Sequence, residues 1–314
     1  MYKEFFGLQS FPFQASPDPR FLCMTPRTRE VLACLQYGIA ERKGFVVMTG
    51  EVGTGKTTLL KSVLSWFPGN VVSTAFVFNP RLDALDFLEF VLTDFGIPPR
   101  ERTKSGMLLQ LNRWLIDRYR EDALCVIVVD EAQNLSPDLL EEIRLLTNLE
   151  TSAEKLVQIV LSGQPELEEM LRMPSLRQLR QRIALWCKTQ PLQQHETEVY
   201  ISERLRIAGA KETIFTPEAV DRIHHYSCGI PRLVNLACEH AMITAYVEQV
   251  TPIPAWVVES VAVDLDLRDQ PFLVESKPHA DRHGEGKAAP PLDVVKPMKD
   301  AKDSQSRSQK EQKI

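Results

Sequence analysis

The feature that most constrains this chain is a glycine-rich stretch that directly follows an apolar run of strand length at residues 45–48. The stretch has the pattern G-x-x-x-x-G-K-T and consists of Gly50, Glu51, Val52, Gly53, Thr54, Gly55, Lys56 and Thr57; Thr58 then opens a helix-forming segment. Glycines let such a turn close so that consecutive backbone N–H groups point at an anion. The pattern therefore predicts a cradle for the phosphates of a nucleotide.

Two side chains of this stretch have a defined chemistry. The Lys56 ammonium can reach the β- and γ-phosphate oxygens as a point charge. The Thr57 hydroxyl can take one coordination position of a Mg²⁺ ion that bridges them. We therefore expect the loop and Thr58 to bind ATP, and Thr57 to bind Mg²⁺ as well.

A second apolar run, at residues 123–129, is typical of a strand that is buried on both faces of a parallel sheet. It ends in Asp130 and Glu131. Asp130 is placed to hold Mg²⁺ through its water shell, and Glu131 to orient and polarise the water that attacks the γ-phosphate. The alternative is a pair of solvated acids in front of a helix expected at 136–149. With the first motif, the carboxylates indicate a site that hydrolyses Mg-ATP.

Length and charge restrict the class of protein. The chain has 314 residues, 44% of them hydrophobic, which suggests about two domains with a full core. Its formal net charge of −5 gives no overall attraction to nucleic acid. The start lacks the apolar stretch of a signal peptide, and no apolar run approaches the roughly 18 residues that span a bilayer. We therefore expect a cytoplasmic protein without a transmembrane segment.

The pattern of elements changes along the chain. Strands are expected at 45–48, 71–77, 124–129, 156–161 and 184–189, in alternation with helices. That alternation predicts an α/β fold, a parallel sheet flanked by helices, over residues 1–191. An aromatic- and proline-rich segment at 1–29 is expected to pack against this base in extended form.

From residue 192 onward the sequence favours helices only, at 196–208, 217–227, 231–247 and 254–263. This predicts a small all-helical domain over 192–267. Residues 268–314 are polar with almost no aromatic side chain, so we expect a disordered tail there.

Taken together, the chain resembles an AAA+ ATPase, with a P-loop NTPase sheet followed by a helical lid. More specifically, it resembles the general secretion pathway protein A (ExeA-type) family, including short soluble relatives encoded beside exosortase and exopolysaccharide loci. The segments that carry the resemblance span about residues 1–262 and are Tyr2-x-x-Phe5-Phe6-Gly7-Leu8, Pro12-Phe13, Pro17-Asp18-Pro19, Gly50 to Thr57, Val129 to Leu135, Leu161 to Leu167, Gln181-Arg182-Ile183 and Gly229-Ile230-Pro231-Arg232.

The resemblance implies further roles. Gln164 matches sensor 1, the polar residue that touches the γ-phosphate or the attacking water, and Ser162 is the alternative. Arg232 matches sensor 2, which reaches from the lid to the γ-phosphate. Arg182 matches the arginine finger that enters a neighbouring subunit's site, although a solvated helical face also fits it. Tyr37 lies where the family packs the adenine ring, and plain helix packing fits it nearly as well.

ExeA-type proteins of the type II secretion pathway carry a membrane span and a periplasmic peptidoglycan-binding domain after the ATPase. This sequence contains neither, which favours the short soluble relatives. The resemblance implies a homo-oligomeric, Mg²⁺-dependent ATPase that assembles or regulates an envelope secretion or exopolysaccharide export system, peripheral at the inner membrane. Two alternatives stay open: a DNA-associated transposition-type helper ATPase, which the acidic balance disfavours, and a nucleotide-gated adaptor that binds ATP and barely hydrolyses it.

Overall fold

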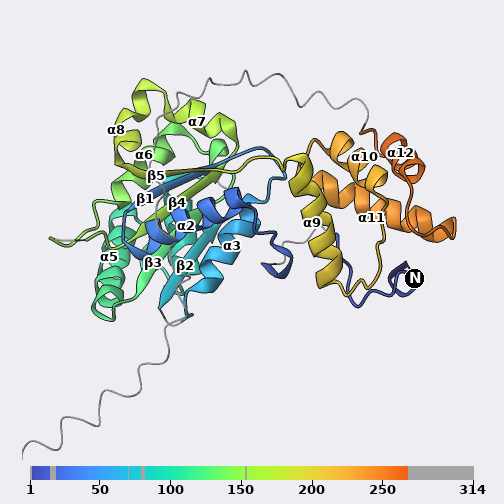
Figure 1. Ribbon diagram of the computed structural model, residues 1–314. Coiled ribbons are helices and arrows are strands. Elements are labelled where there is room, and N and C mark those ends of the chain that lie inside the picture. Colours follow the sequence, from blue (N-terminus) through green and yellow to red (C-terminus); the bar gives the residue numbers. More distant parts are fainter. Residues whose placement is uncertain (1, 15–18, 70, 79–81, 153, 268–314) are drawn as a thin grey trace, which may run out of the picture. The chain divides into compact units, whose positions relative to one another are not determined.

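A parallel sheet organises the base in the computed structural model, which describes residues 2–14, 19–69, 71–78, 82–152 and 154–267 (Figure 1). The strands are β1 (Phe45–Thr49), β2 (Val72–Val77), β3 (Leu124–Val129), β4 (Gln158–Gly163) and β5 (Ile183–Lys188), in the spatial order β2-β3-β4-β1-β5. All five predicted strands are confirmed to within two residues at each end. The predicted tail at 268–314 and most of the Pro17-Asp18-Pro19 motif lie outside the described residues.

The strand order brings both sequence motifs to one edge. β4 lies between β1 and β3 and pairs with each of them in parallel, with Thr49 level with Gly163 and Val129 level with Leu161. Parallel strands all end at the same edge of a sheet, where α/β proteins bind their ligands. The glycine-rich loop after β1, the carboxylates after β3 and Gln164 after β4 therefore meet there.

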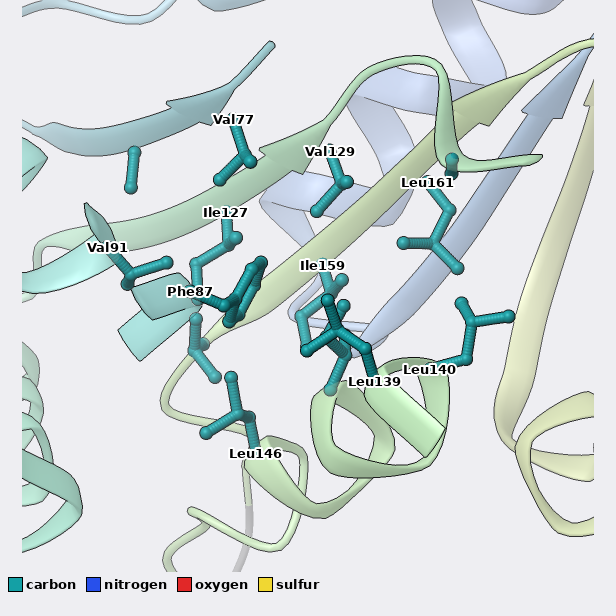
Figure 2. Packing of buried hydrophobic residues seen from close by; sticks show 14 of the residues in the cluster. Val77, Phe87, Val91, Ile127, Val129, Leu139, Leu140, Leu146, Ile159 and Leu161 are labelled. Atoms are coloured by element: carbon teal, nitrogen blue, oxygen red, sulfur yellow. The ribbon is translucent and has the colours of Figure 1, made fainter. Parts of the chain in front are cut away.

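The central strands are buried on both faces, which explains the apolar runs at 45–48, 124–129 and 159–161. Side chains that alternate along the strands, such as Ile127, Val129 and Leu161, pack on one face against Phe87 and Leu140 (Figure 2). The helices of that face are α4 (Ala84–Asp94), α5 (Lys104–Arg120), α6 (Pro137–Leu146), α7 (Pro165–Leu171) and α8 (Arg177–Arg182). The opposite face packs against α2 (Pro26–Ala40) and α3 (Lys56–Trp66).

Helix α6 begins as the sequence predicts. The Ser136 hydroxyl accepts a hydrogen bond from the backbone N–H of Leu139 at 3.1 Å, and Pro137 occupies the first helical turn. The short 3-10 turns of the described residues are η1 (Pro19–Phe21), whose Phe21 belongs to the core of the helical region, η2 (Ala132–Asn134) and η3 (Pro174–Leu176). The η2 turn follows the Asp130-Glu131 pair and holds Gln133, which contacts Glu131.

The carboxyl-terminal described part is helical, as expected. It contains α9 (Gln194–Ile207), α10 (Pro217–Ser227), α11 (Pro231–Val247) and α12 (Ala255–Asp264). These helices share a core of their own, to which Ile201, Ile223, Met242 and Val258 belong. None of the helices in the described ranges combines the length and the apolar character needed to cross a bilayer.

The amino-terminal segment differs from our expectation. It begins with a one-turn helix, α1 (Tyr2–Phe5), and its buried Tyr2, Leu8 and Phe13 belong to the core of the helical region rather than to the base. Backbone contacts agree, since the N–H of Gln9 donates to the carbonyl of Ala208 at 2.7 Å. The helical region buries these side chains in its own apolar core, where the rings of Phe13 and Phe215 lie 6.4 Å apart. The exact domain boundaries, at 191 and at 267, stay predictions.

Candidate nucleotide-binding and active site

The glycine-rich loop is held against the end of β5. Gly53 and Gly55 adopt positive φ angles of 80° and 91°, a conformation that suits glycine, and Gly55 caps the start of α3. A Cβ on Gly50 would lie 1.9 Å from the Thr189 hydroxyl. The Thr54 and Thr189 hydroxyls are hydrogen-bonded at 2.7 Å. The loop shape thus depends on these glycines and on one threonine beyond β5.

Lys56 is buried at the centre of the loop. Its Nζ donates to the backbone carbonyls of Gly50 at 2.8 Å and Glu51 at 3.1 Å. Burial lowers the pKa of this ammonium, while the nearby charges of Glu131 and Asp130 act in the opposite direction. The ammonium therefore sits where the phosphates of a bound nucleotide would compete for it.

Thr57 and Asp130 meet directly. The Thr57 Oγ1 donates to Asp130 Oδ2 at 2.6 Å, and Ser162 Oγ donates to Asp130 Oδ1 at 2.8 Å. Asp130 is buried, so the alternative of two solvated acids does not describe it. A hydroxyl and a carboxylate in contact are hard oxygen donors of the kind that Mg²⁺ prefers. The pair therefore fits a Mg²⁺ ion bound together with phosphates.

Glu131 is fixed by two amides. Its backbone has a positive φ of 55°. Its Oε2 accepts hydrogen bonds from Nε2 of Gln133 at 2.6 Å and from Nε2 of Gln164 at 3.1 Å. Burial opposes the charge of this carboxylate, but the two amides and Lys56 outweigh it, so its pKa lies below the ordinary value. Glu131 thus presents an ionised carboxylate.

The two candidates for sensor 1 contact different carboxylates. Gln164, at the start of α7, binds Glu131, whereas Ser162, buried in β4, binds Asp130. Both lie beside the predicted machinery, and the choice between them stays open.

Arg232 lies in the first turn of the lid helix α11, beside the loop. Its backbone N–H donates to the carbonyl of Gly53 at 3.1 Å, and a Cβ on Gly53 would lie 2.8 Å from Arg232 Cβ. Gly229, just before this helix, packs closely on Leu192, because a Cβ there would lie 1.9 Å from the carbonyl oxygen of Leu192. Arg232 is therefore in place for the predicted sensor 2 role, which stays a prediction.

A cavity of about 1030 Å³ is lined by residues 52–57 of the loop and by Glu131. It is large enough for a nucleoside triphosphate. Sequence reasoning missed part of its wall, namely Thr25, Thr28 and Val31 of the α2 start and Pro231 and Leu233 of α11. Hydroxyl and apolar residues at helix starts carry no chemical signature, and only the fold brings them to the loop.

Tyr37 does not fit the adenine role that we predicted for it. It is missing from the described residues that line the cavity, it is 51% exposed, and its ring lies under Lys43 Nζ at 5.1 Å. The neighbouring Gly38 packs against β1, since a Cβ there would lie 2.5 Å from a methyl group of Val46. Plain helix packing, the alternative interpretation, therefore describes Gly38, whereas the Tyr37 ring is exposed.

Arg182 lies outside its own subunit's cavity. It ends α8 and precedes β5, whose first residue Ile183 pairs with Phe45 at the beginning of β1. The loop lies at the other end of β1. The exposed Arg182 side chain donates to Thr147 Oγ1 at 3.3 Å. Its use in a neighbouring subunit stays a prediction.

Comparison with known proteins agrees with this geometry. Residues 39–171 match the family model described as an AAA domain. Solved structures with a similar fold include the Aeropyrum pernix ORC2 protein (TM-score 0.62, 18% identity, covering 81% of this chain and 71% of that chain). Another is Cdc6p from Pyrobaculum aerophilum (TM-score 0.64, 17% identity, 81% and 70% covered). The protein has the AAA+ fold. The RuvB motor of Thermotoga maritima is similar as well (TM-score 0.53, 16% identity, 82% and 74% covered).

One curated relative is much more similar in sequence. Over 247 residues the chain is 45% identical to general secretion pathway protein A of Aeromonas hydrophila. The aligned region covers 78% of this chain and 45% of the relative. The chain thus spans less than half of the length of that protein. The match shows that the two proteins are related.

Proposed function

We propose that this protein binds Mg-ATP and hydrolyses it to ADP and phosphate. The observation that carries the proposal is the convergence of three groups at one edge of the sheet: Lys56 inside the loop, the Thr57–Asp130 hydrogen bond of 2.6 Å, and Glu131 lining the same cavity. Phosphoryl transfer needs little more than positioning and charge stabilisation, and these groups supply both.

In the proposed reaction the loop N–H groups and Lys56 hold the β- and γ-phosphates. Thr57 and Asp130 would hold Mg²⁺, which neutralises phosphate charge when bound. The oxygen of a water attacks the γ-phosphorus while the bond to the β–γ bridging oxygen breaks, and ADP leaves with that electron pair. The Glu131 carboxylate accepts a hydrogen bond from this water and so orients it. The proton that the water loses ends on the phosphate product. Arg232 approaches the γ-phosphate from the lid.

We further propose that the ATPase acts on a bacterial envelope secretion system, peripheral at the inner membrane and from the cytoplasm. The 45% identity to general secretion pathway protein A supports this assignment. The narrower role, with exopolysaccharide export and exosortase loci, rests on the resemblance of the motifs alone.

A second candidate is a DNA-associated helper ATPase. Arg177, Arg180 and Arg182 are exposed along α8, and this basic surface favours that function. The acidic net charge of −5 disfavours it. The same arginines equally suit a contact between subunits, in which Arg182 would face a neighbour's phosphates.

Steady-state release of phosphate from Mg-ATP, measured with and without double-stranded DNA, separates these functions. The proposal expects turnover that needs Mg²⁺ and that DNA leaves unchanged. Turnover that appears only with DNA would favour the helper ATPase. Tight ATP binding with no turnover in either condition would instead indicate a nucleotide-gated adaptor.

A further inference from the structure

In the η2 turn, both polar atoms of the Gln133 carboxamide form hydrogen bonds. Its Nε2 donates to Glu131 Oε2 at 2.6 Å, and its Oε1 accepts the backbone N–H of Gln164 at 3.1 Å. An amide satisfied in this way has only one orientation that gives both hydrogen bonds. Gln133 therefore links the turn after β3 to the start of α7, and it donates a hydrogen bond to the Glu131 carboxylate, which lines the cavity.

The hydrogen bonds on Glu131 are unevenly distributed. Oε2 accepts from both Gln133 and Gln164, and Glu131 lines the cavity that holds the loop. A glutamate side chain has several rotatable bonds, and two donors on one oxygen restrict them. This arrangement leaves Oε1 to accept a hydrogen bond from a water in the cavity.

The backbone around Gln133 is shaped for its side chain. Glu131 has a positive φ of 55°, which turns the chain so that a side chain two residues later can reach back to it. Gly163, at the end of β4, is also needed, because a Cβ there would lie 2.9 Å from Gln133 Oε1. The room for the carboxamide thus depends on the absence of a side chain on the neighbouring strand.

We propose that Gln133 is a positioning residue, which holds the Glu131 carboxylate in the direction required to orient the attacking water. This inference rests on the proposed function, since it assumes that Glu131 acts on water. Gln133 itself touches neither nucleotide nor water in this account. Its effect on the rate passes through the two hydrogen bonds that its carboxamide makes.

Two replacements of similar size test the proposal. Gln133→Met keeps the length and removes both polar atoms, and Gln133→Glu keeps an acceptor for Gln164 but replaces the donor to Glu131 by a second carboxylate. We expect kcat for ATP to fall roughly 10- to 100-fold in both variants, because a catalytic group misplaced by about 1 Å loses rate on that order. The Kd for ATP should stay within about twofold of the wild-type value. The control is Asn134→Met, an exposed position of the same turn, with kcat unchanged.

Other outcomes overturn the proposal. An unchanged kcat in Gln133→Met does so directly. A fall in kcat accompanied by an equal loss of ATP affinity and a lower melting temperature indicates a structural role instead. In the Glu131→Gln background, Gln133→Met should cause no further loss of the residual kcat. A further loss would mean that Gln133 affects the rate other than through Glu131.

The failure of the proposed function can be told apart from the failure of this inference. Crystal structures of the wild type and of Gln133→Met with a non-hydrolysable ATP analogue report the direction of the Glu131 carboxylate without any turnover. We expect one orientation in the wild type and several in the variant. A single unchanged orientation in the variant would refute the positioning role even if the protein hydrolyses no ATP.

Discussion

Gly50 marks the closest approach between the loop and the chain beyond β5. A Cβ at this position would lie 1.9 Å from Thr189 Oγ1 and 2.8 Å from the Thr189 carbonyl oxygen. We expect Gly50→Ala to push the two segments apart, lower the free energy of unfolding by about 1–3 kcal/mol and weaken ATP binding by about tenfold or more. Urea unfolding and an equilibrium ATP titration measure the two effects.

Gly69→Ala is the matched control. Among the described residues no heavy atom lies within 4 Å of a Cβ built at Gly69. We expect stability and ATP affinity close to those of the wild type. If Gly50→Ala behaves like Gly69→Ala in both assays, the close contact with Thr189 does not shape the loop.

At the scale of elements, Arg204 of α9 joins the amino-terminal segment to the helical region. The buried guanidinium donates to the carbonyl of Pro12 at 2.6 Å and to the Tyr200 hydroxyl at 3.0 Å, and it lies 4.8 Å from the centre of the Phe21 ring. Arg204→Met leaves a buried carbonyl without this donor, so we expect a loss of about 2–3 kcal/mol in the free energy of unfolding.

Arg206→Met controls for that prediction on the same helix. Arg206 is exposed and pairs with Glu203 in the same turn, a type of pair that adds little to stability. Its replacement should leave the urea midpoint almost unchanged. Equal midpoints for the two variants would contradict the role of Arg204 in fastening the segment.

The sequence allowed the strands to be predicted because most of them contain a short apolar run, such as residues 45–48 and 124–129, and because strand-like and helix-like segments alternate. It did not show where the segment at 1–29 packs. Its rings, such as Tyr2 and Phe13, indicate burial but not which of two apolar surfaces buries them. Periodicity likewise could not separate Tyr37, exposed on α2, from a residue that faces the ligand.

Within the site, prediction followed chemistry. Lys56, Thr57 and Asp130 were identified because an ammonium, a hydroxyl and a carboxylate at this spacing have one well-defined use, and the contacts of Lys56 and the Thr57–Asp130 hydrogen bond agree with it. The contact between Gln133 and the Glu131 carboxylate was not predicted. An amide two residues after a glutamate has many uses, and only the positive φ of Glu131 and the register of β3 and β4 bring it to the carboxylate.

At the scale of the whole molecule, the position of Arg182 suggests that active sites are shared between subunits. An arginine supplied at the transition state accelerates phosphoryl transfer by about 10³–10⁵ in well-studied NTPases. We expect Arg182→Ala to bind ATP normally and to turn over slowly. Mixing it with Lys56→Ala should recover activity, because an interface can then combine an intact loop with an intact Arg182.

The readout is phosphate release from an equimolar mixture, under conditions where labelled subunits demonstrably exchange. A mixture no more active than the two variants assayed separately would rule out sharing through Arg182. Specific activity of the wild type should also rise with protein concentration, since dilution separates the subunits.

The central claim is that the edge formed by β1, β3 and β4 hydrolyses Mg-ATP, and Glu131→Gln tests it most directly. The replacement preserves the shape of the side chain and removes only the carboxylate that orients water. ATP affinity and the rate of phosphate release should be measured on the same preparation, beside Lys56→Ala. The account predicts that Glu131→Gln retains wild-type ATP affinity and loses phosphate release, whereas Lys56→Ala loses binding. Near-normal phosphate release by Glu131→Gln would contradict it.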